Sequence, residues 1–134
     1  MTVIVTDAGF GPETWKNGFC SAGAAANDLC ALDVPADADP AGITLTPTLN
    51  MIRVDFPSPA DGRGFTIARQ LRLRGFTGRL RARGHLISDQ YAMARRSGFD
   101  EVEISAALAA RQPECDWLFR ANWQDHDYQS RLRG

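Results

Sequence analysis

The spacing of apolar and polar residues between positions 50 and 104 predicts a strand–helix–strand–helix–strand unit. Residues 51–56 form a short apolar run that Pro57 ends, which is typical of a buried strand. Residues 65–75 then have apolar side chains at helical spacing, with arginines on the other side of the wheel. We therefore expect an amphipathic helix that packs its apolar side against the first strand.

The second half of this unit repeats the alternation. Residues 79–83 alternate basic with small or apolar side chains, which predicts a second strand, and residues 86–97 have the spacing of a second helix. Val102 and Ile104 alternate with acids, as in a third strand. Strands separated by single helices are expected to be parallel. The predicted fold class is α/β, with a central parallel β-α-β-α-β unit of half-barrel or Rossmann-like type.

The rest of the chain is expected to add smaller elements to this unit. The predicted additions are a strand at 3–6, a glycine-containing loop that follows it, a weak helix at 21–28, a strand at 29–34, an exposed acidic connector at 35–42, an edge strand at 43–45 and a short helix at 105–111. A chain of 134 residues with 44% hydrophobic residues can bury one core. We predict a single domain, 1–134, with its core at 43–111, an N-terminal region at 1–42 and a C-terminal tail at 112–134.

Charge is unevenly distributed along the chain, although the net charge is only −1. Residues 61–96 contain nine arginines and two acids, whereas the segments before and after them are acidic. The planar guanidinium group binds oxyanions with two parallel hydrogen bonds. We therefore expect a positive, arginine-rich face. Because the flanks are acidic, the pI is about 6.1 and no nucleic-acid motif is present, nucleic acid is not an expected partner.

The sequence contains no recognised cofactor, metal or membrane motif. Cys20, Cys30 and Cys115 are widely spaced and form no zinc or iron–sulfur pattern, so we expect reduced thiols and no metal. Neither a GxGxxG nor a GxxxxGK[ST] motif is present, and no cofactor is predicted. No apolar run approaches the roughly 18 residues that span a bilayer, and the N-terminus has no signal-peptide pattern. The expected location is the cytoplasm.

Polar groups near the carboxyl ends of the predicted strands are the first site candidates, because ligands of parallel α/β sheets usually bind there. The candidate catalytic residues are Asp55, Asp89, Gln90 and His85. Gln90 falls in the apolar sector of the predicted second helix, where a buried amide needs partners that are either structural or part of a ligand. One histidine without a recognisable nucleophile or second ligand is weak evidence for catalysis. The sequence leaves open whether the protein is an enzyme.

The DGRG segment, residues 61–64, is expected to begin the first helix. Asp61 is well placed as its N-cap. The alternative is an anion-binding turn in which Arg63 and free backbone N–H groups hold the ligand. The full set of candidate anion- or partner-binding residues is Asp61, Arg63, Arg69, Arg81, Arg83 and Arg96.

Large aromatic residues are concentrated in the C-terminal tail, where Trp117, Trp123 and Tyr128 stand among charged residues. Two explanations fit this pattern. Either the tail folds back and covers the core, or its aromatic residues are rigid anchors that dock on a partner.

Six short motifs together resemble a known bacterial family. They are DFP at 55–57, DGRG at 61–64, ARxLR at 68–72, GxLRAxG at 78–84, DQ at 89–90 and RxGFD at 96–100. The family consists of small proteins of unknown function that are encoded beside siroheme-dependent assimilatory sulfite reductase, and some are described as predicted oxidoreductases of sulfite reduction. His85 departs from the acidic residue of the family at its position.

This resemblance implies a role in sulfur assimilation. The first hypothesis is an accessory protein, either an adaptor or an electron-transfer partner, that binds sulfite reductase through the arginine-rich face. The alternative is a small oxidoreductase or anion-binding enzyme with a pocket at the carboxyl ends of the strands, lined by Asp55, Arg81, Asp89 and Gln90. A third hypothesis is a homodimer that covers the exposed edges of the sheet.

Overall fold

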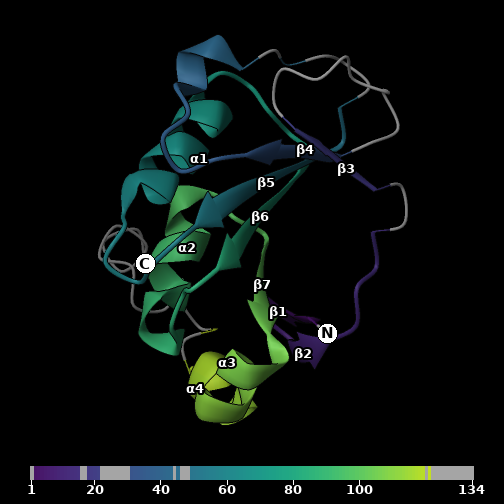
Figure 1. Ribbon diagram of the computed structural model, residues 1–134, viewed down its shortest axis with the longest axis vertical. Helices are drawn as coiled ribbons and strands as arrows, with labels where there is room; N and C mark the ends of the chain where they lie inside the picture. Colours follow the sequence, from purple (N-terminus) through teal and green to yellow (C-terminus); the bar gives the residue numbers. More distant parts are fainter. Residues whose placement is uncertain are drawn as a thin grey trace, which may run out of the picture.

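The computed structural model describes residues 2–15, 18–21, 31–43, 45, 49–119 and 121. Within these residues one sheet has the strand order β2-β1-β7-β6-β5-β4-β3 (Figure 1). Its strands are β1 (Thr2–Thr6), β2 (Gly9–Gly11), β3 (Phe19–Ser21), β4 (Ala31–Val34), β5 (Met51–Phe56), β6 (Arg79–Gly84) and β7 (Glu101–Ser105). The helices are η1 (Pro40–Gly42), α1 (Arg63–Leu73), η2 (Ser88–Gln90), α2 (Tyr91–Ser97), α3 (Ala106–Arg111) and α4 (Glu114–Phe119).

The predicted central unit is confirmed. Strands β3 to β7 are parallel, and α1 and α2 connect β5 to β6 and β6 to β7. The hairpin of β1 and β2 adds two antiparallel strands at the β7 edge. The mixed α/β fold therefore follows from the alternation of strand and helix patterns that the sequence contains.

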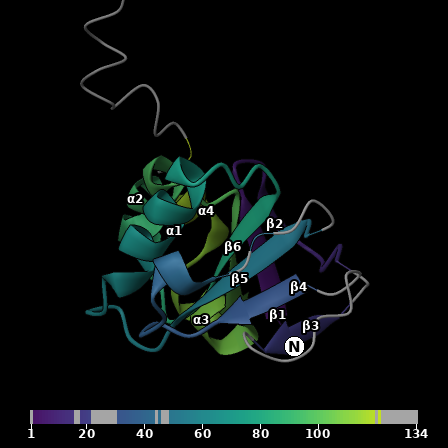
Figure 2. The same cartoon turned by 90° about the horizontal axis from the view of Figure 1, so that it is seen from above.

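Helices α1 and α2 cover one face of this sheet (Figure 2). The sheet side of this core contains Val54, Ala82 and Val102, which are fully buried, and the helix side contributes Leu71 and Ala94. Successive residues of a strand point to opposite faces. The alternate residues of β5, β6 and β7 consequently point to the face that these two helices do not cover.

The C-terminal tail, as far as the structure describes it, packs against the core. The Trp117 side chain is 1% exposed, its ring lies 6.0 Å from that of Tyr91, and its indole N–H donates to the Gln112 carbonyl at 2.8 Å. Trp117 is therefore not an exposed docking residue, because its ring completes the core. Trp123 and Tyr128 lie outside the described residues.

Two sequence predictions for short segments are wrong. The glycine-containing loop after the first strand forms β2, because Gly9 to Gly11 pair with β1. Ile43 is not in an edge strand but follows η1, and its side chain is 6% exposed in the core.

The connector that ends at η1 is held by Arg74, whose Nη1 donates to the carbonyl oxygens of Pro40 and Ile43. The predicted helix at 21–28 falls on residues that are, apart from Ser21 in β3, outside the described part.

The second helix begins later than its sequence pattern predicts. Residues 88–90 form the 3-10 turn η2, and the α-helix proper is Tyr91–Ser97. Gln90 ties this turn together, because its side-chain oxygen accepts from the Ile87 N–H at 3.0 Å while its amide nitrogen donates to the Pro59 carbonyl at 2.7 Å. These contacts agree with the structural alternative for Gln90, in which the side-chain amide binds other parts of the protein.

Gly84 ends β6 at a position that a larger residue occupies only with strain. Its φ is +127°, and a Cβ there would overlap the carbonyl oxygen of Phe56. We expect Gly84→Ala to lower the free energy of unfolding by about 2 kcal/mol or more in urea denaturation. Gly42→Ala is the matched control, because nothing lies within 4 Å of its added Cβ and its φ is not positive. Equal unfolding midpoints for the two variants would contradict this prediction.

Candidate functional site

Charged side chains line the sheet face that α1 and α2 leave uncovered. In the register of the strands, Asp33 lies beside Arg53, Arg53 beside Arg81, and Arg81 beside Glu101, so they form one row across β4 to β7. A second row consists of Asp55, Arg83 and Glu103, and Arg79 precedes Arg81 on the same strand. We call this surface the charged face. Its residues are Asp33, Arg53, Asp55, Arg79, Arg81, Arg83, Glu101 and Glu103.

Arg81 is the centre of the charged face, and its side chain is fully buried. Its Nε donates to Glu101 at 2.6 Å. Nη1 contacts Glu13 and Glu103, and Nη2 contacts Glu13 and Glu101. Burial by itself lowers the pKa of Arg81, but the three carboxylates outweigh it and raise the pKa. Every guanidinium nitrogen thus already has a carboxylate partner, and Arg81 has no donor left for an added anion.

The neighbouring arginines of the charged face are paired in the same way. Arg53 donates from Nε and Nη2 to Asp33 at 2.6 and 2.7 Å, and from Nη1 to Glu103 at 3.1 Å. Arg79 donates from Nη2 to Glu101 at 2.7 Å. These bidentate pairs fix the planes of the guanidinium groups. The charged face is therefore an ordered array of opposite charges rather than a positive surface.

A segment that follows β2 lies over the charged face on the side away from α1 and α2 (Figure 1). From it, Glu13 reaches Arg81, and the Thr14 hydroxyl accepts from Arg79 at 3.0 Å. The Phe19 ring stacks on the Arg53 guanidinium, with 3.5 Å between the ring centroid and the Cζ of Arg53. The centroid of the Trp15 ring lies 5.9 Å from the Cζ of Arg79. We call the described residues 13–15 and Phe19 the strap. The strap replaces a second helix layer over part of this face.

The candidate sites from the sequence include Asp55, Arg81 and Arg83 of the charged face, but neither the strap nor the other five sheet charges, which are Asp33, Arg53, Arg79, Glu101 and Glu103. Glu101 and Glu103 have the same two-residue spacing as Arg79, Arg81 and Arg83, and that spacing could have matched them across neighbouring strands. No comparable signal exists for Glu13. It lies 68 positions before Arg81 in the chain, and only the path of the chain over the sheet brings the two together.

The predicted arginines do not form one face, which corrects the expectation of a single positive band. Arg81 and Arg83 belong to the charged face, whereas Arg69 and Arg96 are exposed on α1 and α2, on the other side of the sheet. The reason is that strand arginines with two-residue spacing and helix arginines on the solvent side point in opposite directions. Arg63 is at the start of α1, the helix that also contains Arg69.

The DGRG segment forms a closed ion pair. The Asp61 carboxylate accepts from the Arg63 backbone N–H at 3.1 Å and from its guanidinium at 2.7 Å, and the guanidinium bond lowers the pKa of Asp61. The N-cap position itself is Gly62, one residue later than predicted. Arg63 also borders a shallow hollow of about 320 Å³ next to Asp37 and Thr66, near the carboxyl end of β4.

The candidate catalytic residues lie in different places. Asp55 is half exposed on the charged face and pairs with Arg83 at 3.8 Å. His85 is exposed directly after β6, and Asp89 and Gln90 are in η2. Asp55 and Arg81 thus belong to the charged face, whereas the other two residues of the proposed pocket belong to the turn that precedes α2. The arrangement shows no nucleophile, base and orienting group in contact among the residues that the structure describes.

Among the described residues, no group of three or more histidine, cysteine, aspartate or glutamate side chains could hold a metal ion. Cys115 is exposed. No helix within the described ranges has the length and apolar character needed to cross a bilayer.

The comparisons with known proteins identify a family. A family model described as "Bacterial protein of unknown function (DUF934)" matches residues 31–133. The searches of curated proteins and of solved structures gave no match. The matched segment includes all charged residues of β4 to β7, whereas the strap precedes it. The resemblance to a bacterial family of unknown function is confirmed, and its connection with sulfite reductase remains a prediction.

Arg81 holds two buried carboxylates in place, and its removal should be costly. We expect Arg81→Leu to lower the free energy of unfolding by about 3 kcal/mol, because Glu101 and Glu103 would lose the buried charge that they share and keep only their pairs with Arg79 and Arg53. Arg83→Leu is the control on the same strand: its side chain is 49% exposed, and the expected loss is about 0–1 kcal/mol. Urea denaturation of both variants measures the difference, and similar losses would refute the central role of Arg81.

Glu13 should make stability depend on pH in acid. Hydrogen bonds from Arg81 lower the pKa of Glu13 from 4.5 to about 2. Since the pKa is lower in the folded state, ionised Glu13 stabilises the fold above pH 4.5, and this contribution is lost as the pH falls toward 2.

We expect Glu13→Gln to lose less stability than the wild type when the pH is lowered through this range. Urea midpoints measured across the range test this expectation. Thr14→Val removes a neighbouring strap contact without removing a titrating group, so its pH dependence should match the wild type. If the urea midpoint of Glu13→Gln fell with pH as steeply as that of the wild type, Glu13 would not stabilise the fold through its charge.

Proposed function

The chain belongs to the DUF934 family of bacterial proteins, and we propose that it is an accessory protein of assimilatory sulfite reduction that binds siroheme sulfite reductase through the charged face. The sulfite reductase partner comes from the resemblance of the six motifs. The charged face as the binding surface comes from the geometry. In this proposal the protein works in the cytoplasm as an adaptor or as an electron-transfer partner.

The observation that supports a binding surface is the one-sided covering of the sheet. Parallel sheets are normally covered by helices on both faces. Here α1 and α2 cover one face, and within the described part of the chain only the strap lies over the other. Four members of the charged face remain within reach of a partner, because the Asp33, Asp55, Arg79 and Arg83 side chains are 34–49% exposed.

The order of the charges suits recognition better than a uniform positive surface would. With Glu13, the face presents four arginines and five carboxylates in fixed rows, so a partner must match a pattern of signs. Complementary charges of this kind give specificity and fast association more than affinity. Because the exposed members are screened by ions, binding should weaken as salt is added.

The second candidate is a small oxidoreductase or anion-binding enzyme. The hollow beside Arg63 favours it, since this hollow lies near the carboxyl end of β4 and at the beginning of α1. An anion there would have to compete with Asp61, which already accepts from the Arg63 guanidinium. Sulfite-dependent turnover that Asp89→Ala abolishes without unfolding would favour this candidate over the adaptor.

A homodimer that extends the sheet has less support at the β2 edge. The Phe10 backbone N–H, which a new strand would need, already donates to the Glu114 carboxylate of α4 at 2.7 Å. A carboxylate at a strand edge disfavours pairing with another chain. Size-exclusion chromatography of the purified protein tests this third hypothesis.

A charge swap on the charged face tests the main proposal. Asp55→Arg combined with Arg83→Asp keeps an ion pair but reverses the pattern that a partner meets. We expect this variant to bind the cognate sulfite reductase about tenfold more weakly at low salt, measured by co-elution and calorimetry. Arg96→Glu, on the helix side, is the control and should bind as the wild type does.

Three results would count against the proposal. Wild-type protein that fails to associate with the reductase at low salt would remove the adaptor function itself. Association that the charge swap leaves unchanged, or that Arg96→Glu abolishes instead, would show that the reductase uses another surface.

A further inference from the structure

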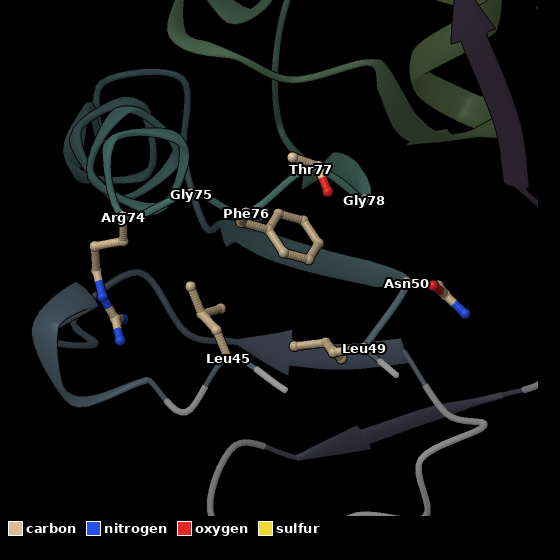
Figure 3. Close-up of a pocket in the computed structure, with 8 residues that line it drawn as sticks. All are labelled: Leu45, Leu49, Asn50, Arg74, Gly75, Phe76, Thr77 and Gly78. Atoms are coloured by element: carbon tan, nitrogen blue, oxygen red, sulfur yellow. The ribbon is translucent and has the colours of Figure 1, made fainter. Parts of the chain in front are cut away.

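A cavity lies at the amino ends of β5 and β6, the opposite edge of the sheet from the hollow beside Arg63. Its volume is about 400 Å³. It is bordered by Leu45, Leu49 and Asn50 before β5, by Arg74 after α1, and by the turn at residues 75–78 that leads to β6 (Figure 3). This size falls in the range of about 300–1,000 Å³ that is usual for small-molecule sites.

Leu45, Leu49 and Phe76 form the apolar part of the cavity lining. Figure 3 shows the Phe76 ring above the side chains of Leu45 and Leu49, while the Asn50 side chain points away from them. Phe76 is 6% exposed, so its ring is held by the core rather than loose at the surface. A flat apolar body could therefore lie against a fixed aromatic surface and two leucines.

Arg74 supplies the charge at one end of this apolar part. Its Nη1 donates to the carbonyl oxygens of Pro40 at 2.6 Å and of Ile43 at 2.7 Å. Nη1 has two hydrogens, and both are used. Among the described residues no acceptor contacts Nε or Nη2, which together form the edge that binds a carboxylate with two parallel hydrogen bonds. The two carbonyl contacts anchor the guanidinium, so little side-chain freedom is lost when an anion binds.

We propose that this cavity binds a small aromatic anion, with its carboxylate or sulfonate on Arg74 and its ring against Phe76 and the two leucines. This site is independent of the charged face and of the proposed function. Arg81 is saturated by carboxylates and the other arginines of the charged face also pair with them, whereas Arg74 has, among the described residues, one guanidinium edge without an acceptor and an adjacent apolar surface.

A matched pair of probes tests both parts of the proposed site. 2-Naphthoate carries the anion and the ring, and 2-naphthamide has the same ring without the charge. In titrations followed by ¹⁵N–¹H NMR, we expect 2-naphthoate to shift the amide signals of residues 74–78 saturably. The amide analogue should bind about tenfold more weakly, because it lacks the charge-assisted hydrogen bonds.

Two variants test whether probe binding requires Arg74 or is nonspecific. Arg74→Ala should weaken 2-naphthoate binding about tenfold or more, whereas substitution of the exposed Arg69 on α1, five residues earlier, by alanine (Arg69→Ala) should leave it unchanged. If Arg74→Ala loosens the loop at Pro40 and loses its fold, Thr77→Glu serves instead. Thr77 is exposed at the cavity rim, and a carboxylate there should repel the anion without disturbing the core.

The outcomes are distinct. Saturable shifts at residues 74–78 that need both the carboxylate and Arg74 support the site. Equal affinities for the two probes, shifts scattered over other surfaces, no shifts at millimolar probe, or unchanged binding by a folded Thr77→Glu protein would each overturn it. None of these results depends on sulfite reductase binding.

Discussion

Arg81 has a permanent charge and no contact with water, and the structure around it is arranged to neutralise that charge. Glu101 and Glu103 reach it from the neighbouring strand, and Glu13 reaches it from the strap. A buried ion network of this kind adds little net stability, because desolvation offsets most of the attraction. Its stronger effect is on register. A slip of one residue in β6 would turn Arg81 into the helix-covered core and expose Leu80 or Ala82.

This constraint gives the two faces of the sheet different roles. The face under α1 and α2 is an ordinary apolar core, which needs only close packing. The charged face needs each charge opposite its partner, so its geometry is fixed by ion pairs and by the rings of Phe19 and Trp15. The family model covers the sheet charges but begins after the strap. The sheet pairs thus lie within the matched segment, and the strap lies outside it.

The same distinction explains where binding is expected. Arginine is often taken as a sign of anion binding, but a guanidinium group whose nitrogens are all paired has nothing to offer a ligand. In this protein the strand arginines support a surface that recognises a pattern of charges. Arg74 differs because the loop carbonyls use only one of its nitrogens, and it stands beside apolar side chains instead of carboxylates. The number of arginines in the sequence does not distinguish a guanidinium group paired with carboxylates from one that can bind an anion.

The sequence by itself determined the central β-α-β-α-β unit, because two-residue and helical spacings are local properties that each segment carries alone. It also determined that Arg81 and Arg83 share a face, since they lie two residues apart on one strand. Only the tertiary structure decided that Glu13 meets Arg81, that Trp117 is buried, and that helix and strand arginines point apart. These contacts join segments far apart in the chain, and no local spacing records which of them will meet.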